Sequence, residues 1–262
     1  MSAAGREGAA PAGGARGSLS RLPGTVTVHT GLAGIAEAAA AWLETIAREA
    51  SAASGRFRIA LAGGGTPRTL YELLASAPWR RRTRWDAWEV FFGDERAIPP
   101  EAGGSNFRMA RESLLSRVPI PEERVHRMEA ERVDLDAAAA DYAAVLTAAC
   151  PPWGPARVPR LDCVLLGLGE NGHTVSLFPG DPSLDVTDRW VVRSRADYAP
   201  YDRLTLTFPV LDAAAHAAFL VAGAAKGEAL RGVLRGDVPA ARVHPRDGEL
   251  RWFLDEAAAG AL

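Results

Sequence analysis

The sequence is best understood from residues 167–180, which read GLGENGHTVSLFPG. This segment follows a mostly apolar run over residues 161–166, which we predict to be a buried strand. Its glycines allow the backbone to turn sharply and to approach a ligand closely. His173 then comes just past the strand end, where ligands bind in open α/β sheets. Because imidazole is suited to proton transfer near neutral pH, His173 is a candidate general acid or base.

Strand and helix patterns alternate along the rest of the chain. Strands are predicted over residues 25–28, 57–61, 89–92, 161–166, 190–192, 204–208, 218–221 and 251–254. Helices are predicted over residues 34–53, 69–75, 105–117, 136–149 and from residue 226 to residue 234. This alternation predicts an α/β fold, with a mostly parallel, Rossmann-like sheet that carries helices on both faces. We expect a single domain over residues 23–262. It follows a disordered leader over residues 1–22, which are rich in Gly, Ala, Ser and Arg.

Composition and charge exclude several classes of protein. Of the 262 residues, 48% are hydrophobic and 24% are charged, as in ordinary globular proteins. The net charge of -2 provides no basic field for nucleic acid. No apolar run approaches the roughly 18–20 residues of a membrane span. Two cysteines, Cys150 and Cys163, are too few for a zinc site, and HxH and HExxH spacings are absent, so no metal is expected. We therefore expect a cytoplasmic protein.

Four loops that follow predicted strands are rich in glycine or polar residues: residues 63–67, 93–96, 167–174 and 223–226. Such loops share one edge of a parallel sheet, so we expect them to converge on one pocket. In the first loop, Thr66 suits the N-cap of a helix and Pro67 suits its first position. Free N–H groups at this helix start, with Gly64, Gly65 and Thr66, form a candidate phosphate cradle. The alternative is a tight turn that needs small residues.

Charged residues follow the strand predicted over residues 89–92. We expect Asp94 to orient a substrate hydroxyl or a protonated imidazole, and Arg96 to hold a phosphate or a carboxylate. A solvated loop with internal ion pairs is the alternative. Downstream, Ser105 suits a helix cap, and Asn106 is a candidate for facing the pocket.

Two further cations lie near predicted strand ends. Arg203 begins the strand predicted over residues 204–208, and Lys226 stands at a helix start. A lysine there opposes the helix dipole, which makes more sense if an anion binds nearby. Both residues are therefore candidate phosphate ligands, with plain surface cations as the alternative.

Together these motifs resemble the 6-phosphogluconolactonase family. The matching segments are residues 63–67, 93–96 with 105–106, 167–180, 203–207 and 223–226. The resemblance implies hydrolysis of 6-phosphoglucono-1,5-lactone, a small phosphosugar, in the second step of the oxidative pentose phosphate pathway. It also implies a fold shared with glucosamine-6-phosphate deaminase and ribose-5-phosphate isomerase, and no metal or organic cofactor. His173 falls on the family's catalytic histidine, which is expected to activate water.

One residue departs from the family pattern. The family most often has aspartate where this chain has Asn171, and asparagine brings no negative charge to an imidazolium. Asp94 or Glu170 would have to supply such a charge. Two other functions stay open: an aldose–ketose isomerase or deaminase, and a sugar-phosphate sensor without catalysis. The chain is expected to be a monomer or a small homo-oligomer.

Overall fold

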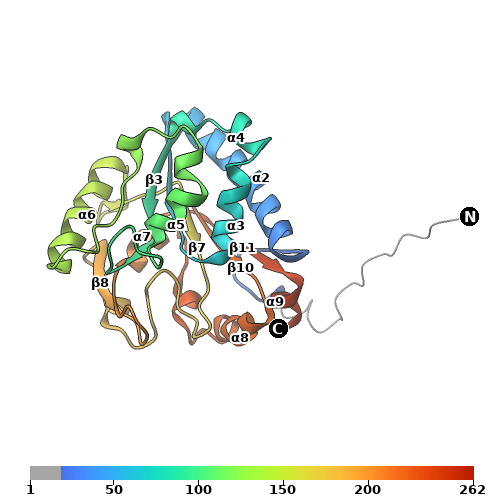
Figure 1. The fold of residues 1–262 in the computed structure, drawn as a ribbon. Helices are drawn as coiled ribbons and strands as arrows, with labels where there is room; N and C mark the ends of the chain where they lie inside the picture. Colours follow the sequence, from blue (N-terminus) through green and yellow to red (C-terminus); the bar gives the residue numbers. More distant parts are fainter. Residues whose placement is uncertain (1–18) are drawn as a thin grey trace, which may run out of the picture.

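The computed structural model describes residues 19–262 and is built around a parallel sheet of six strands (Figure 1). In spatial order the strands are β1 (Thr25–His29), β11 (Glu249–Asp255), β10 (His216–Val221), β7 (Cys163–Leu166), β2 (Phe57–Leu61) and β3 (Trp88–Phe92). Every neighbouring pair in this sheet is parallel. The α/β fold predicted from the alternating pattern is therefore confirmed.

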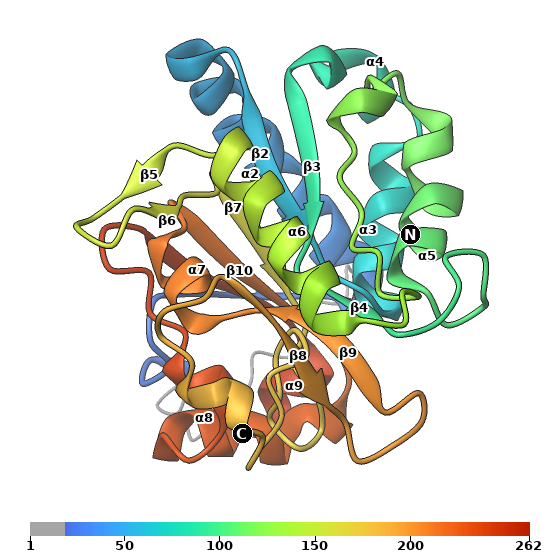
Figure 2. The same cartoon turned by 90° about the vertical axis from the view of Figure 1, so that its left-hand side faces the viewer.

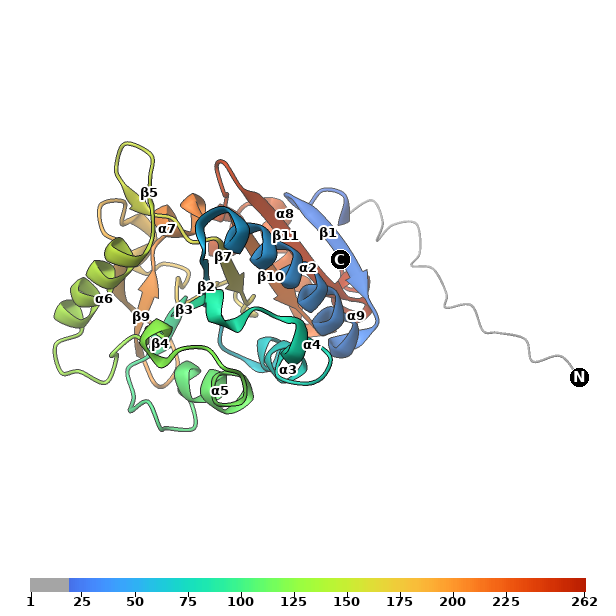
Figure 3. The same ribbon diagram turned by 90° about the horizontal axis from the view of Figure 1, so that it is seen from above.

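Helices cover both faces of the sheet, as predicted. Helix α2 (Gly31–Ser54) and α3 (Gly65–Leu74) pack together on one face, and α7 (Phe208–Ala213) lies over the other (Figure 3). The two centre strands, β7 and β10, are consequently buried on both sides and are apolar almost throughout. Such strands carry no alternation of polar and apolar residues.

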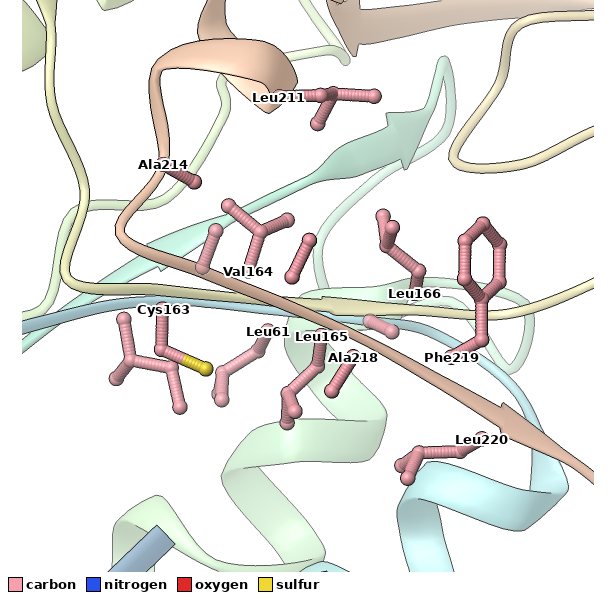
Figure 4. Close-up of a cluster of buried hydrophobic side chains, with 14 of the residues drawn as sticks. Leu61, Cys163, Val164, Leu165, Leu166, Leu211, Ala214, Ala218, Phe219 and Leu220 are labelled. Carbon is pink, nitrogen blue, oxygen red and sulfur yellow. The ribbon is translucent and has the colours of Figure 1, made fainter. Parts of the chain in front are cut away.

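Figure 4 shows how the side chains of β7 divide between the two faces. Val164 and Leu166 point toward Leu211 of α7, whereas Cys163 and Leu165 point to the opposite side. Cys163 is fully buried and free, and burial raises the pKa of its thiol. It therefore acts as a small hydrophobic residue of the core.

A second, antiparallel sheet lies beside the first and joins distant parts of the chain. It pairs β4 (Asp94–Arg96) with β9 (Asp202–Leu206), and β9 with β8 (Val191–Arg195). Helix α6 (Leu135–Ala149) packs against β8 (Figure 2). Residues 93–96 were expected to form a loop; that expectation is wrong for β4, because pairing with β9 extends the backbone there.

The remaining elements are short or lie near the ends of the main strands. Besides short 3₁₀ helices, they are α4 (Trp79–Arg82), α5 (Asn106–Ser113), α8 (Gly227–Arg235), α9 (Glu256–Gly260) and a hairpin of β5 (Pro152–Trp153) with β6 (Val158–Pro159). Within residues 19–262, no helix combines the length and the apolar character that a membrane crossing requires.

The start of the fold differs from the expectation. Residues 1–18 of the predicted leader lie outside the described residues. Leu19 and Leu22, which were counted with the leader, are buried against the core; the single domain over residues 23–262 stays a prediction. Burial of two leucines compensates for ordering this short segment, a gain that a count of small and polar residues does not reveal.

Helix ends were predicted with mixed success. Gly55 ends α2 in the left-handed conformation and Ser105 caps α5, both as expected. Helix α3 instead begins at Gly65 with Gly64 as its N-cap, so Thr66 is not the cap and Pro67 is not the first helical residue. Gly64 has φ +105°, a conformation that side chains disfavour.

Candidate active site

A cavity of about 500 Å³ opens where β2, β3, β7 and β10 end. Its lining residues are Ala62, Gly63, Gly64, Asp94, Arg96, Asn106, Gly167, Leu168, Gly169, Glu170, Asn171, His173, Val175, Ser176, Phe178, Asp197, Tyr198, Arg203 and Lys226. The four loops predicted to converge all contribute to this lining, so the prediction is confirmed. Two residues of the expected phosphate cradle, Gly65 and Thr66, are not among the lining residues.

His173 is presented by a tight turn after β7. The N–H of Gly169 donates to the carbonyl of His173 at 2.8 Å, and the N–H of Gly172 donates to the carbonyl of Gly169 at 3.0 Å. A Cβ atom on Gly169 would lie 2.0 Å from Nδ1 of His173. Glycine is therefore required here because the imidazole lies directly against the backbone.

The imidazole of His173 is held on two sides. Its Nδ1 lies 2.5 Å from Oδ1 of Asn171, and its ring centroid lies 4.5 Å from that of Phe178. Burial lowers the pKa of His173 below its ordinary value; Asp94 opposes this shift, whereas Lys226 favours it. The ring is therefore neutral at neutral pH and able to accept a proton.

Asp94 is buried and held by neutral donors. Its Oδ1 accepts from Nδ2 of Asn106 at 3.0 Å, and its Oδ2 accepts from Oγ of Ser176 at 2.5 Å. The same Asn106 amide donates to the backbone carbonyl of Asp94 at 2.9 Å. A Cβ on Gly63 would lie 1.9 Å from Oδ1 of Asn106, so this glycine makes room for the amide. Asp94 thus offers its charge to His173 without an ion-pair partner within residues 19–262.

Glu95 has a structural part beside this site. Its carboxylate accepts from the backbone N–H groups of Arg96, Asn106 and Phe107, and from the hydroxyl of Ser105. Burial raises the pKa of Glu95, and these hydrogen bonds oppose the rise. Glu95 therefore fixes the start of α5, and through it Asn106, rather than facing the cavity.

Two arginines face one another on neighbouring strands of the second sheet. Arg96 of β4 pairs in register with Arg203 of β9, whose side chain is only 2% exposed. Burial, followed by the charge of Arg96, lowers the pKa of Arg203. Their guanidinium groups donate to the carbonyls of Gly104 and Pro200, respectively. Like charges at facing positions repel, so this arrangement favours an anion in the cavity.

Lys226 supplies a third cation on the cavity wall. It lies between Gly223, whose φ is +95°, and the start of α8. Its backbone N–H donates to the carbonyl of Gly223 at 3.1 Å. Within residues 19–262 its ammonium group makes no hydrogen bond or ion pair, so it is available to a ligand. The structure therefore brings His173, Asp94, Asn106, Gly64 and the three predicted cations to one cavity. No metal-ligand cluster of three or more His, Cys, Asp or Glu side chains occurs in the described part of the chain.

The lining residues that were not predicted include Ser176, Phe178, Asp197 and Tyr198. Phe178 contacts the ring of His173, and Tyr198 lies edge-on to Phe178 with ring centroids 6.0 Å apart. The guanidinium carbon of Arg203 lies 5.5 Å from the Tyr198 ring. Ser176 and Phe178 share the segment of His173, which was a usable signal. Asp197 and Tyr198 lie in the loop between β8 and β9, and only the strand pairing places them here.

Comparison with known proteins finds relatives that match most of the chain. Residues 32–252 match the family model described as glucosamine-6-phosphate isomerases/6-phosphogluconolactonase. The 6-phosphogluconolactonase of Nostoc sp. is 42% identical over 213 residues, covering 79% of this chain and 85% of the relative. That of Synechocystis sp. is 40% identical over 219 residues, covering 82% and 88%.

Solved structures show the same likeness. The 6-phosphogluconolactonase of Trypanosoma brucei superposes with a TM-score of 0.80 at 28% identity, covering 92% of this chain and 99% of that one. A monomeric glucosamine-6-phosphate deaminase, at 21% identity and a TM-score of 0.75, shares the fold and covers 91% of this chain and 100% of that one. The chain belongs to the glucosamine-6-phosphate isomerase/6-phosphogluconolactonase family.

Proposed function

We propose that this chain hydrolyses 6-phospho-D-glucono-1,5-lactone to 6-phospho-D-gluconate, the second step of the oxidative pentose phosphate pathway. The observation that carries the proposal is a single cavity with a neutral imidazole, His173, and the facing cations Arg96 and Arg203. A phosphorylated lactone needs both features, a base for water and an anchor for the phosphate. Relatives at 40–42% identity bear the name of this enzyme.

The phosphate is held at the cationic side of the cavity. A dianion between Arg96 and Arg203 replaces their mutual repulsion by two attractions, and Lys226 adds a third. Gly64, at the N-cap of α3, contributes the positive end of a ten-residue helix. This assignment places the anchor on Gly64 rather than on Gly65 and Thr66, which lie off the cavity wall.

The reaction then proceeds at the imidazole. A water molecule attacks the lactone carbonyl carbon while His173 takes one of its protons. The tetrahedral intermediate collapses with cleavage of the bond to the ring oxygen, and the imidazolium returns the proton to that oxygen. Asp94 stabilises the transient imidazolium. Acid–base help of this kind contributes about 10²–10⁴ in rate, and anchoring of the remote phosphate adds orientation.

The test is a rate assay with freshly generated δ-lactone, in which proton release is followed. We expect hydrolysis well above the spontaneous rate with the phosphorylated lactone, and a much higher KM with unphosphorylated glucono-1,5-lactone. Ammonia release from glucosamine 6-phosphate is measured in parallel. Ammonia release without lactone hydrolysis would replace this proposal by the deaminase alternative.

We also propose that one chain suffices for the reaction, whether it is a monomer or a small homo-oligomer. The buried residues form one connected core, and the proposed base and phosphate ligands line one cavity beside it. Location in the cytoplasm stays a prediction from the sequence.

A further inference from the structure

Asn171 makes two hydrogen bonds through a single oxygen. Its Oδ1 accepts from the backbone N–H of His173 at 3.2 Å, and the same atom lies 2.5 Å from Nδ1 of the His173 ring. A backbone N–H can only donate, so the atom of the Asn171 amide that faces it must be oxygen and not nitrogen. The orientation of the amide is thereby fixed from the backbone.

This orientation decides where the imidazole carries its proton. Two lone pairs facing one another at 2.5 Å would repel, so Nδ1 of His173 must be the donor to Oδ1 of Asn171. We infer that Asn171 is a positioning residue that holds His173 in the Nδ1–H tautomer and leaves the basic lone pair on Nε2. This inference deepens the proposed function, because Nε2 is then the atom that takes the proton from water.

The hydrogen bond to Asn171 is the contact that orients the His173 ring. Gly169 closes one side without a Cβ, and Phe178 packs nearby with its ring plane tilted by 39°. Both contacts are apolar or steric and do not distinguish the two ring nitrogens. Within residues 19–262, Asn171 is the one hydrogen-bond partner of the His173 ring.

Asn171 orients the ring without adding a charge. The charged groups that act on His173 are Asp94 on β4 and Asp197 in the β8–β9 loop, which favour its protonation. Lys226 before α8 and Arg203 on β9 oppose it. A carboxylate at position 171 would keep the acceptor and add a close negative charge. The amide therefore keeps the base neutral to lower pH than a carboxylate would.

The first test needs no substrate and thus stands apart from the proposed lactonase activity. The chain has five histidines, so a protein with 15N-labelled imidazoles gives a short set of ring signals. The signals of His173 are identified by their loss in His173→Asn. At a pH above the pKa of His173, we expect Nδ1 to resonate as a protonated nitrogen and Nε2 as an unprotonated one. The reverse assignment overturns the inference.

Two variants separate orientation from charge. Asn171→Asp should preserve the tautomer and move the acid limb of kcat/KM upward by about 1–3 pH units, because an opposite charge close by stabilises the imidazolium. Asn171→Leu removes the acceptor. It should mix the tautomers and lower kcat by at least about 10-fold, with KM changed by less than about 2-fold; a wrong tautomer costs up to about 10⁴ in serine proteases.

Thr45→Asp on the exposed face of α2 is the control for added charge and should leave the pH profile unmoved. An Asn171→Leu enzyme with wild-type kcat and an unchanged tautomer contradicts the inference. An acid limb that does not move in Asn171→Asp contradicts it as well. If Asn171→Leu does not fold, the wild-type spectrum and the Asn171→Asp profile still decide.

Discussion

Gly169→Ala is the substitution whose effect on the proposed base follows most clearly from geometry. The added Cβ would lie 2.0 Å from Nδ1, 2.1 Å from Cε1 and 2.7 Å from Cγ of His173. Ordinary contacts begin at about 3.4 Å, so the ring must move by about 1.4 Å. A misplacement of about 1 Å costs roughly 10²-fold in rate, so we expect kcat to fall by at least about 10².

The assay follows lactone hydrolysis together with thermal unfolding. Because φ of Gly169 is not in the left-handed region and the ring can shift into the cavity, we expect Tm to change little. KM should also change little, since the cations that hold the phosphate are untouched. Gly103→Ala is the matched control: a Cβ there meets nothing within 4 Å. A Gly169→Ala enzyme with wild-type kcat would mean that the position of this ring does not govern the rate.

Three further predictions concern the charges of the site. Arg96→Met should raise KM for the phosphorylated lactone by about 10-fold or more while leaving kcat/KM for unphosphorylated lactone unchanged. An equal loss of kcat/KM on both lactones would contradict the assignment of Arg96 to the phosphate. Because burial lowers the pKa of His173, kcat/KM should stay level as the pH falls to about 6.5, the ordinary histidine value. Below that pH it should decline as the imidazolium forms. A decline that begins above pH 7 would contradict a buried base. Glu95→Gln should lower the free energy of unfolding in urea by about 1–3 kcal/mol, because an amide NH₂ then faces N–H donors. An unchanged midpoint of urea unfolding would contradict a structural role for the Glu95 carboxylate.

The main sheet could be predicted from the sequence because its signals are local. Most of its strands are short apolar runs, and β1 alternates threonine and valine; helical periods or glycine-rich loops separate the strands along the chain. The position of His173 follows from the same logic, since a turn after the buried β7 must lie at the ligand-binding edge.

Strands were predicted over residues 190–192 and 204–208, which overlap β8 and β9, but β4 and the pairing of the second sheet could not be predicted, because these strands come from distant parts of the chain. Residues 94–96 carry three charges in a row, a pattern that resembles a loop, and they become a strand only because β9 lies beside them. The facing of Arg96 and Arg203 is a consequence of that register. The same pairing brings Tyr198 to the cavity from a loop without any motif.

The start of helix α3 was predicted wrongly for a different reason. Thr66 and Pro67 match the usual cap and first position, but Gly64 adopts a backbone conformation that begins the helix before them. Cap rules describe preferences of side chains, whereas this start is set by a glycine at positive φ. Of the predicted phosphate cradle of Gly64, Gly65 and Thr66, only Gly64 lines the cavity, so the proposed phosphate anchor keeps Gly64 alone.

The most direct test of the proposed mechanism compares wild type with His173→Asn. The rate of hydrolysis of fresh 6-phosphoglucono-1,5-lactone is measured for both proteins at one pH near neutrality. We expect rapid turnover by the wild type, a loss of about 10²–10⁴ in kcat in the variant, and closely similar KM values. Equal kcat values for the two proteins would show that this imidazole does not activate the water.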